Sequence, residues 1–177
     1  MAEDPIILVL PEAPEDVRAR MRAEWPRAEI RLGPWLTSTD EVLSKDLAGG
    51  VEILLCEVPP ANFDDFECLK WIQLTSHGYT QVLGLPVVER GIRVSIGLGN
   101  FDIPIAEWNI MMMLMWHRHM LEMLQHQKDH IWDRSAILHS ELRGATVCFY
   151  GYGGIARQTA RLAKALGLVV WALKPDG

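Results

Sequence analysis

The sequence has no long uninterrupted hydrophobic segment. Its longest apolar stretch, Ile110–Trp116, is far shorter than the roughly 20 residues that a membrane-spanning helix requires. Glu3 and Asp4 precede the first apolar run, whereas a secretory signal begins with positively charged residues. The sequence therefore predicts a cytoplasmic protein that does not associate with membranes.

Cysteine is scarce, and positive charge is not in excess. Cys56, Cys68 and Cys148 form no close pair, so the sequence suggests neither a disulfide framework nor a zinc knuckle, and buried structural thiols are expected. The formal net charge of −6 argues against a protein that binds nucleic acid by neutralising phosphates. The excess negative charge lies within residues 1–100, which suggests a break near Asn100.

Strand and helix patterns alternate over the first hundred residues, within a chain whose 177 residues suit one large domain or one domain and part of another. Helices are expected at Pro14–Trp25 and at Ser38–Leu47, the second capped by Ser38 or Thr39 with Glu41 on its first turn. Such alternation predicts an α/β fold with a parallel, doubly wound sheet. The expected strands are Ile6–Leu10, Glu29–Leu32, Val51–Cys56, Trp71–Thr75 and Arg93–Ile96.

A different pattern follows Asn100. The stretch from Ile105 to about Gln127 contains no proline or glycine and predicts one long helix. Its apolar residues surround the helix, so they cannot all face one small core, and we expect a homodimer built on this helix. Burial between the two domains of one chain is the competing explanation.

A second strand, turn, helix and strand end the sequence: Thr146–Tyr150, Ile155–Leu166 stopped by Gly167, and Leu168–Leu173. The turn reads Gly151, Tyr152, Gly153, Gly154, Ile155 and Ala156, which matches G-x-G-x-x-A. After a strand and at the start of a helix, this pattern is typical of a dinucleotide-binding turn whose glycines let the backbone approach a pyrophosphate. A glycine turn without a ligand remains the alternative, and methyltransferases share a similar loop.

Lys174 stands where an acidic residue would accept hydrogen bonds from the ribose of NAD. A cation at this position can pair with the 2′-phosphate of NADP, so NADP is slightly favoured over NAD as the cofactor. A solvated loop lysine is the alternative. Asp176, two residues further on, could be a displaced acceptor.

The histidines do not form a metal site by pattern. His126 and His130 have helical i, i+4 spacing, but no carboxylate or thiol pattern accompanies them, so no metal is expected. Nor is an Asp or Glu predictable beside His77 to set its tautomer and pKa for proton transfer. The sequence therefore offers no catalytic residue of its own.

Several short motifs carry a family resemblance. They run in order along the chain: Leu69–Gln73, Thr75–Tyr79, Glu89–Val94, Asn100, Ile105–Glu107, Trp132–Arg134, Glu141–Gly144 and the glycine turn. With these motifs the sequence resembles the D-isomer-specific 2-hydroxyacid dehydrogenases, clearly over residues 50–177 and only in pattern over the first 50. Three positions depart from the family: Thr80 replaces an Asp, Trp108 a His and Gly154 an Arg.

The resemblance implies a flavodoxin-like substrate domain at residues 1–100 and the first part of a Rossmann-type NAD(P)-binding domain at 101–177. It implies that Ser76, His77, Gly78 and Tyr79 bind the carboxylate of a 2-hydroxy or 2-oxo acid, and that Asn100 forms a hinge and cleft wall. It also implies dimerisation through the helix 105–127. The family's catalytic Arg, Glu and His lie beyond the segment that matches Gly177.

Three functions remain open from the sequence. The first is the front half of such a dehydrogenase, shortened by proteolysis, by design or by gene truncation and inactive alone. The second is a natural short form that acts as a nucleotide-binding or interaction protein. The third is another nucleotide-binding enzyme that shares the glycine turn.

Overall fold

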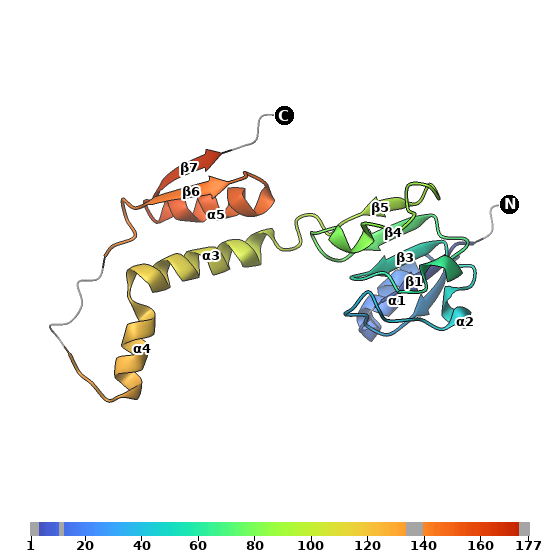
Figure 1. Cartoon of the computed structure of the whole chain (residues 1–177), viewed down its shortest axis with the longest axis horizontal. Helices are drawn as coiled ribbons and strands as arrows, with labels where there is room; N and C mark the ends of the chain where they lie inside the picture. The colour runs from blue at the N-terminus through green and yellow to red at the C-terminus, as the bar shows by residue number, and fades with distance from the viewer. Residues whose placement is uncertain (1–3, 11–12, 134–139, 174–177) are drawn as a thin grey trace. The chain divides into compact units, whose positions relative to one another are not determined.

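A computed structural model describes residues 4–10, 13–133 and 140–173 of the chain (Figure 1). The chain forms two compact units, Met1–Leu98 and Gly99–Gly177. The division falls beside the break near Asn100 that the charge distribution suggests. In the described part of the chain, no helix is both long enough and apolar enough to cross a membrane.

The first unit is built on a five-stranded parallel sheet in the order β2-β1-β3-β4-β5. The parallel, doubly wound sheet predicted from the sequence is thereby confirmed, and each strand lies within its predicted range. Runs rich in Ile, Leu and Val form these strands because both faces of a parallel sheet are normally buried. The strands are β1 (Ile6–Val9), β2 (Glu29–Leu32), β3 (Ile53–Cys56), β4 (Trp71–Leu74) and β5 (Arg93–Ser95).

One face of this sheet carries the main core. Leu8, Leu54 and Ile72 are completely buried there, on three neighbouring strands. Phe63 and Phe66, in and after the 3-10 helix η1 (Phe63–Asp65), pack onto the same cluster, as does Val82 of η2 (Thr80–Val82). Because side chains alternate along a strand, the intervening residues point to the other face.

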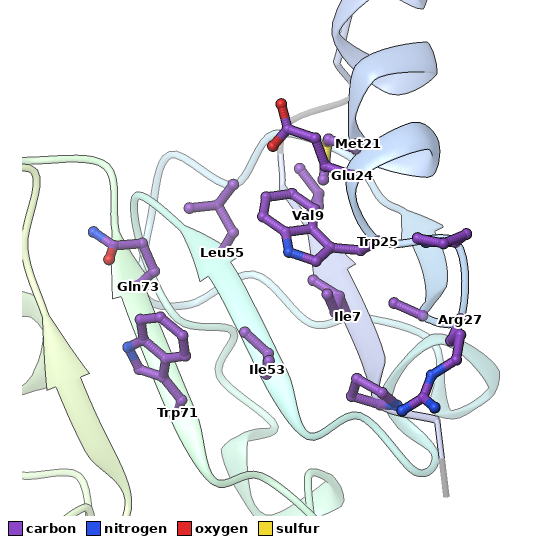
Figure 2. Close-up of a pocket in the computed structure, with 13 residues that line it drawn as sticks. Ile7, Val9, Met21, Glu24, Trp25, Arg27, Ile53, Leu55, Trp71 and Gln73 are labelled. Atoms are coloured by element: carbon purple, nitrogen blue, oxygen red, sulfur yellow. The ribbon is translucent and has the colours of Figure 1, made fainter.

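The opposite face is covered by α1 (Glu15–Glu24), which was expected at Pro14–Trp25. Beside this helix an open apolar pocket of about 710 Å³ is lined by residues that include Ile7, Ile53 and Trp71 of the sheet and Met21 of the helix (Figure 2). The Trp71 side chain is 41% exposed. In the first unit's described part, this face is therefore less completely covered than the core face.

The helix expected at Ser38–Leu47 is wrong in its first half. The helix α2 covers only Lys45–Ala48 and follows Ser44, so neither Ser38 nor Thr39 caps it. The Glu41 carboxylate instead accepts hydrogen bonds from the backbone nitrogens of Thr37 (2.8 Å) and Ser38 (2.9 Å). These bonds hold the segment in a turn, which competes with helix formation.

The second unit contains α3 (Asp102–His117), α4 (Met120–Lys128), β6 (Thr146–Tyr150), α5 (Gly154–Ala165) and β7 (Val169–Leu173). The strands β6 and β7 pair in parallel, and Gly167 has a left-handed φ of +83° where the helix was expected to stop. The strand, helix and strand predicted here are thus confirmed.

The single long helix expected from Ile105 to Gln127 is wrong, because the chain breaks between α3 and α4. His119 has a left-handed backbone with φ +49°. Its amide nitrogen bonds the Trp116 carbonyl oxygen, which closes α3, while the His119 carbonyl accepts the first bond of α4 from Met123. In Figure 1, α4 turns away from the axis of α3.

Small residues bring α3 and α5 together. Thr159, Ala160 and Ala163 form the buried face of α5. Asn109 of α3 donates a hydrogen bond to the Thr159 hydroxyl at 3.1 Å, and that hydroxyl donates to the Ile155 carbonyl at 2.9 Å. These bonds join the middle of α3 to the first half of α5.

Candidate functional site: a glycine turn and a loop after the fourth strand

The glycine turn connects β6 to α5. Gly151 has φ +95°, a conformation that glycine adopts at no steric cost, and its amide nitrogen bonds the Leu173 carbonyl at 2.8 Å. Gly153 is the N-cap of α5, and because it has no side chain it does not cap the first amides of the helix. An ideal Cβ at Gly151 or Gly153 would meet no atom within 4 Å.

These features leave space and hydrogen-bond donors at the start of α5. The first amides of a helix have no partner within the helix, and the helix dipole makes that end positive. An anionic group can therefore approach the turn closely. This geometry fits the pyrophosphate of a dinucleotide, which is the group that the sequence pattern predicts.

The other predicted cofactor residues occupy different surroundings. Tyr152 is 39% exposed, with its ring centroid 6.4 Å from that of Phe149. Ile155 and Ala156 are half-buried in the first turn of α5. Lys174 and Asp176, on which the choice between NADP and NAD depends, lie outside the described residues.

Gly154 differs from the two preceding glycines. An ideal Cβ at this position would overlap the carboxylate of Asp102, the first residue of α3. Sequence reasoning missed Asp102, because nothing local relates two residues that are 52 positions apart. The only signal was that Gly154 replaces the family's usual Arg.

The loop after β4 is held by its own polar groups. The Ser76 hydroxyl donates to the Gly78 carbonyl at 2.9 Å, and the Gln81 side-chain nitrogen donates to Ser76 Oγ at 2.7 Å and to the Glu57 carbonyl at 2.9 Å. The Ser76 carbonyl accepts a bond from the amide of Gly97 at 2.8 Å. Gln81 was not expected from the sequence, yet it links this loop to the segment after β3.

The remaining predicted substrate residues are arranged around this loop or outside it. Gly78 has open space at its Cβ position, Tyr79 is 58% exposed, and His77 Nδ1 is buried without a hydrogen-bond partner in the described structure. The loop lies at the carboxyl end of β4, the edge at which open α/β sheets bind ligands. Asn100 lies in an exposed turn that belongs to the second unit.

The thiols were expected to be buried, and this is correct only for Cys56. Burial in β3 raises the pKa of the Cys56 thiol to about 12, whereas Cys68 and Cys148 are exposed. Cys148 lies at an exposed position of β6, in which alternate side chains are half-buried and the others are exposed. Within the described ranges, no three His, Cys, Asp or Glu residues are grouped to hold a metal ion.

The architecture and the turn define a class: an α/β protein with a dinucleotide-type turn between two parallel strands. Comparison with known proteins shows which family the second unit is similar to. Residues 110–177 match the family description "D-isomer specific 2-hydroxyacid dehydrogenase, NAD binding domain".

Two relatives are similar to parts of the chain. A hydroxypyruvate reductase from Thermotoga maritima is 31% identical over 87 residues, which are 49% of this chain and 28% of the relative. A (S)-sulfolactate dehydrogenase from Chromohalobacter salexigens is 48% identical over 44 residues, or 25% of this chain and 14% of the relative.

A solved structure of a D-isomer specific 2-hydroxyacid dehydrogenase family protein from Aeromonas salmonicida has the same fold, with a TM-score of 0.79 at 21% identity. It matches 97% of this chain, and the chain spans 53% of that protein. The chain thus spans about half the length of this solved relative.

Proposed function

We propose that this chain supplies the substrate-binding domain and the first part of the NAD(P)-binding domain of a 2-hydroxyacid dehydrogenase. The observation that carries the proposal is the open glycine turn between the parallel strands β6 and β7, at the N-terminus of α5. The reaction is hydride transfer between nicotinamide and a 2-hydroxy or 2-oxo acid, for which the bound cofactor supplies or accepts the hydride.

The residues of this chain bind and orient in that reaction. The amides at Gly153 and in the first turn of α5 would hold the pyrophosphate, and Gly151 provides the tight turn that exposes them. The loop Ser76–Tyr79 receives the substrate carboxylate on its amides, since Gly78 leaves the backbone accessible. Asn100, in the turn at the start of the second unit, is proposed as the hinge residue.

Cofactor choice and assembly are further parts of the proposal. Lys174 replaces the acidic ribose acceptor, so NADP(H) is expected to bind at least as well as NAD(H). A homodimer is proposed on α3, whose Met112 and Trp116 side chains are 44% and 82% exposed. Because the helix breaks at His119, α4 does not continue α3, and the proposed dimer interface is centred on α3 alone.

Gly153→Val tests the cofactor site. The variant should fold normally, since the Gly153 φ of −81° is ordinary and its Cβ position is open, but the larger side chain would block a pyrophosphate. Titration with NADH and NADPH, followed by their fluorescence, is expected to show binding that Gly153→Val abolishes. Gly78→Val, at an equally open position in the other unit, is the matched control and should retain binding.

Binding of neither cofactor to the native chain, or equal binding by Gly153→Val, would contradict the proposal.

The native chain assayed with glyoxylate or hydroxypyruvate and NAD(P)H is expected to show no turnover. The reason is that no proton donor is assigned within these 177 residues, and loss of such groups costs several orders of magnitude in rate. Turnover within about tenfold of a full-length relative would overturn this part of the proposal.

A further inference from the structure

The carboxylate of Asp102 lies directly over Gly154 at the start of α5. An ideal Cβ at Gly154 would lie 2.6 Å from Asp102 Cγ and 2.7 Å from Oδ1, and it would overlap Oδ2. Such distances are too short for any real side chain, so residue 154 must be glycine while Asp102 keeps this position. Both residues belong to the second unit, in which α3 packs on α5.

The Asp102 carboxylate is not neutralised by the described residues around it. Its Oδ1 atom is buried and accepts no hydrogen bond, and no ion pair to Asp102 is formed in the described part of the chain. An unpaired negative charge therefore borders the helix N-terminus that offers its amides to an anion. The two influences on a phosphate at this turn oppose each other.

We propose that Asp102 is a specificity-determining residue that weakens the grip of the glycine turn on phosphate. This inference rests on the proposed function, since it concerns the same dinucleotide turn. The carboxylate repels a pyrophosphate, and in its observed position it also occupies the space that a side chain at position 154, cationic ones included, would need. Asp102 thus determines both the charge and the space next to the turn.

The physical basis is the interaction between like charges in a partly desolvated site. Two like charges several Å apart oppose binding by an amount that depends strongly on the local dielectric. Dissolved salt screens this repulsion, so it weakens as ionic strength rises. A residue that only supported the fold would not produce such a dependence on salt.

The test compares NADH binding by the native chain, Asp102→Asn and Asp102→Ala at low and high salt. Both variants should bind NADH about tenfold more tightly at low ionic strength, because the repelling charge is absent. The advantage should shrink as salt is added. Asp102→Asn keeps the shape of the side chain, and Asp102→Ala removes its hydrogen-bonding groups, so agreement between the two isolates the charge.

Two controls accompany the variants. Glu107→Gln removes the same charge from α3 at an exposed position that lines a groove with Leu162 and Leu166, away from the turn, and should leave NADH affinity unchanged. Adenosine, which has no phosphate, should bind the native chain and the Asp102 variants equally. Thermal unfolding of each variant checks that the fold is retained.

Equal NADH affinity in the native chain and in a folded Asp102→Asn would overturn the inference, as would a gain that is independent of salt or shared by adenosine. If Gly153→Val abolishes NADH binding while Asp102→Asn does not improve it, only this inference fails. If none of the proteins binds NADH, the proposed function fails together with it.

Discussion

At the scale of single residues, Glu41 organises the connection between β2 and α2. Its Oε1 atom accepts hydrogen bonds from two backbone nitrogens and, at 3.2 Å, from the Thr37 hydroxyl. The backbone bonds from Thr37 and Ser38 are the main reason that the pKa of the Glu41 carboxyl is lowered from its ordinary value of 4.5. A carboxylate that is better stabilised in the folded than in the unfolded chain couples its ionisation to stability.

Glu41→Gln is expected to lower the melting temperature at neutral pH, because the amide is a weaker acceptor than the carboxylate. The contribution of Glu41 is fully present above the unfolded pKa and is lost as pH falls through the lowered folded pKa. The difference between the native chain and the variant should therefore shrink below pH 4.5. Thermal unfolding followed by circular dichroism from pH 7 to about pH 3 measures it.

The matched control is Glu24→Gln, which removes an exposed carboxylate on α1. A Glu41→Gln difference that stays constant with pH would show that the carboxylate charge is not involved.

The same residue shows a limit of sequence reasoning. Glu41 fits the first turn of a helix equally well, and only the three-dimensional contacts reveal that it closes a turn instead.

At the scale of elements, the strands and the helices α1 and α5 were predictable, whereas the start of α2 and the break between α3 and α4 were not. Apolar runs such as Ile53–Cys56 belong to strands because burial on both faces requires them, and that requirement is visible in the sequence. The break at His119 involves neither glycine nor proline, so no local pattern marks it. The pairing of Asp102 with Gly154 depends on how α3 packs on α5, which periodicity does not reveal.

The segment after β2 offers a test of packing between elements. Gly33 is buried, its amide bonds the Val9 carbonyl at 3.0 Å, and an ideal Cβ would overlap Leu10 Cδ2 in the core. Gly33→Ala is therefore expected to lower the free energy of unfolding by about 1–3 kcal/mol through overpacking. Chemical denaturation measures this loss.

Gly49→Ala is the control for Gly33→Ala, since its Cβ would lie 3.4 Å from the Lys45 carbonyl and its φ of −58° suits alanine. It should change the free energy of unfolding by no more than about 0.5 kcal/mol. Equal stability of the two variants would mean that Leu10 moves aside without cost, contrary to the packing described.

At the scale of the whole molecule, the exposed side of α3 predicts self-association. Ile110 and Met113 pack into the core of the second unit, while Met112 and Trp116 remain exposed on the same helix. Burying such side chains contributes about 25 cal/mol per Å² of apolar surface, enough to favour a dimer over an exposed helix face. Light scattering is expected to give twice the 20.0 kDa mass of one chain.

Changing Met112 and Trp116 together to Glu should return the mass to that of one chain. Val88→Glu, at a position that is 84% exposed in the first unit, should leave the dimer intact. A native chain that stays at 20.0 kDa at micromolar concentration would refute the dimer.

Because Cys56 is buried and the other two thiols are exposed, the rate at which Cys56 is labelled reports how often the first unit opens. The thiolate is the species that attacks a thiol reagent, so a raised pKa and complete burial both protect Cys56. In native chain treated with Ellman's reagent, Cys68 and Cys148 should react quickly and Cys56 only when the first unit opens. A Cys68→Ser, Cys148→Ser variant isolates that slow reaction, and labelling as fast as that of an exposed thiol would contradict it. Where the first unit recloses faster than the reagent labels it, the labelling rate of Cys56 divided by that of an unprotected thiol gives the equilibrium constant for opening. The free energy of opening of the unit built on the five-stranded sheet follows from this constant.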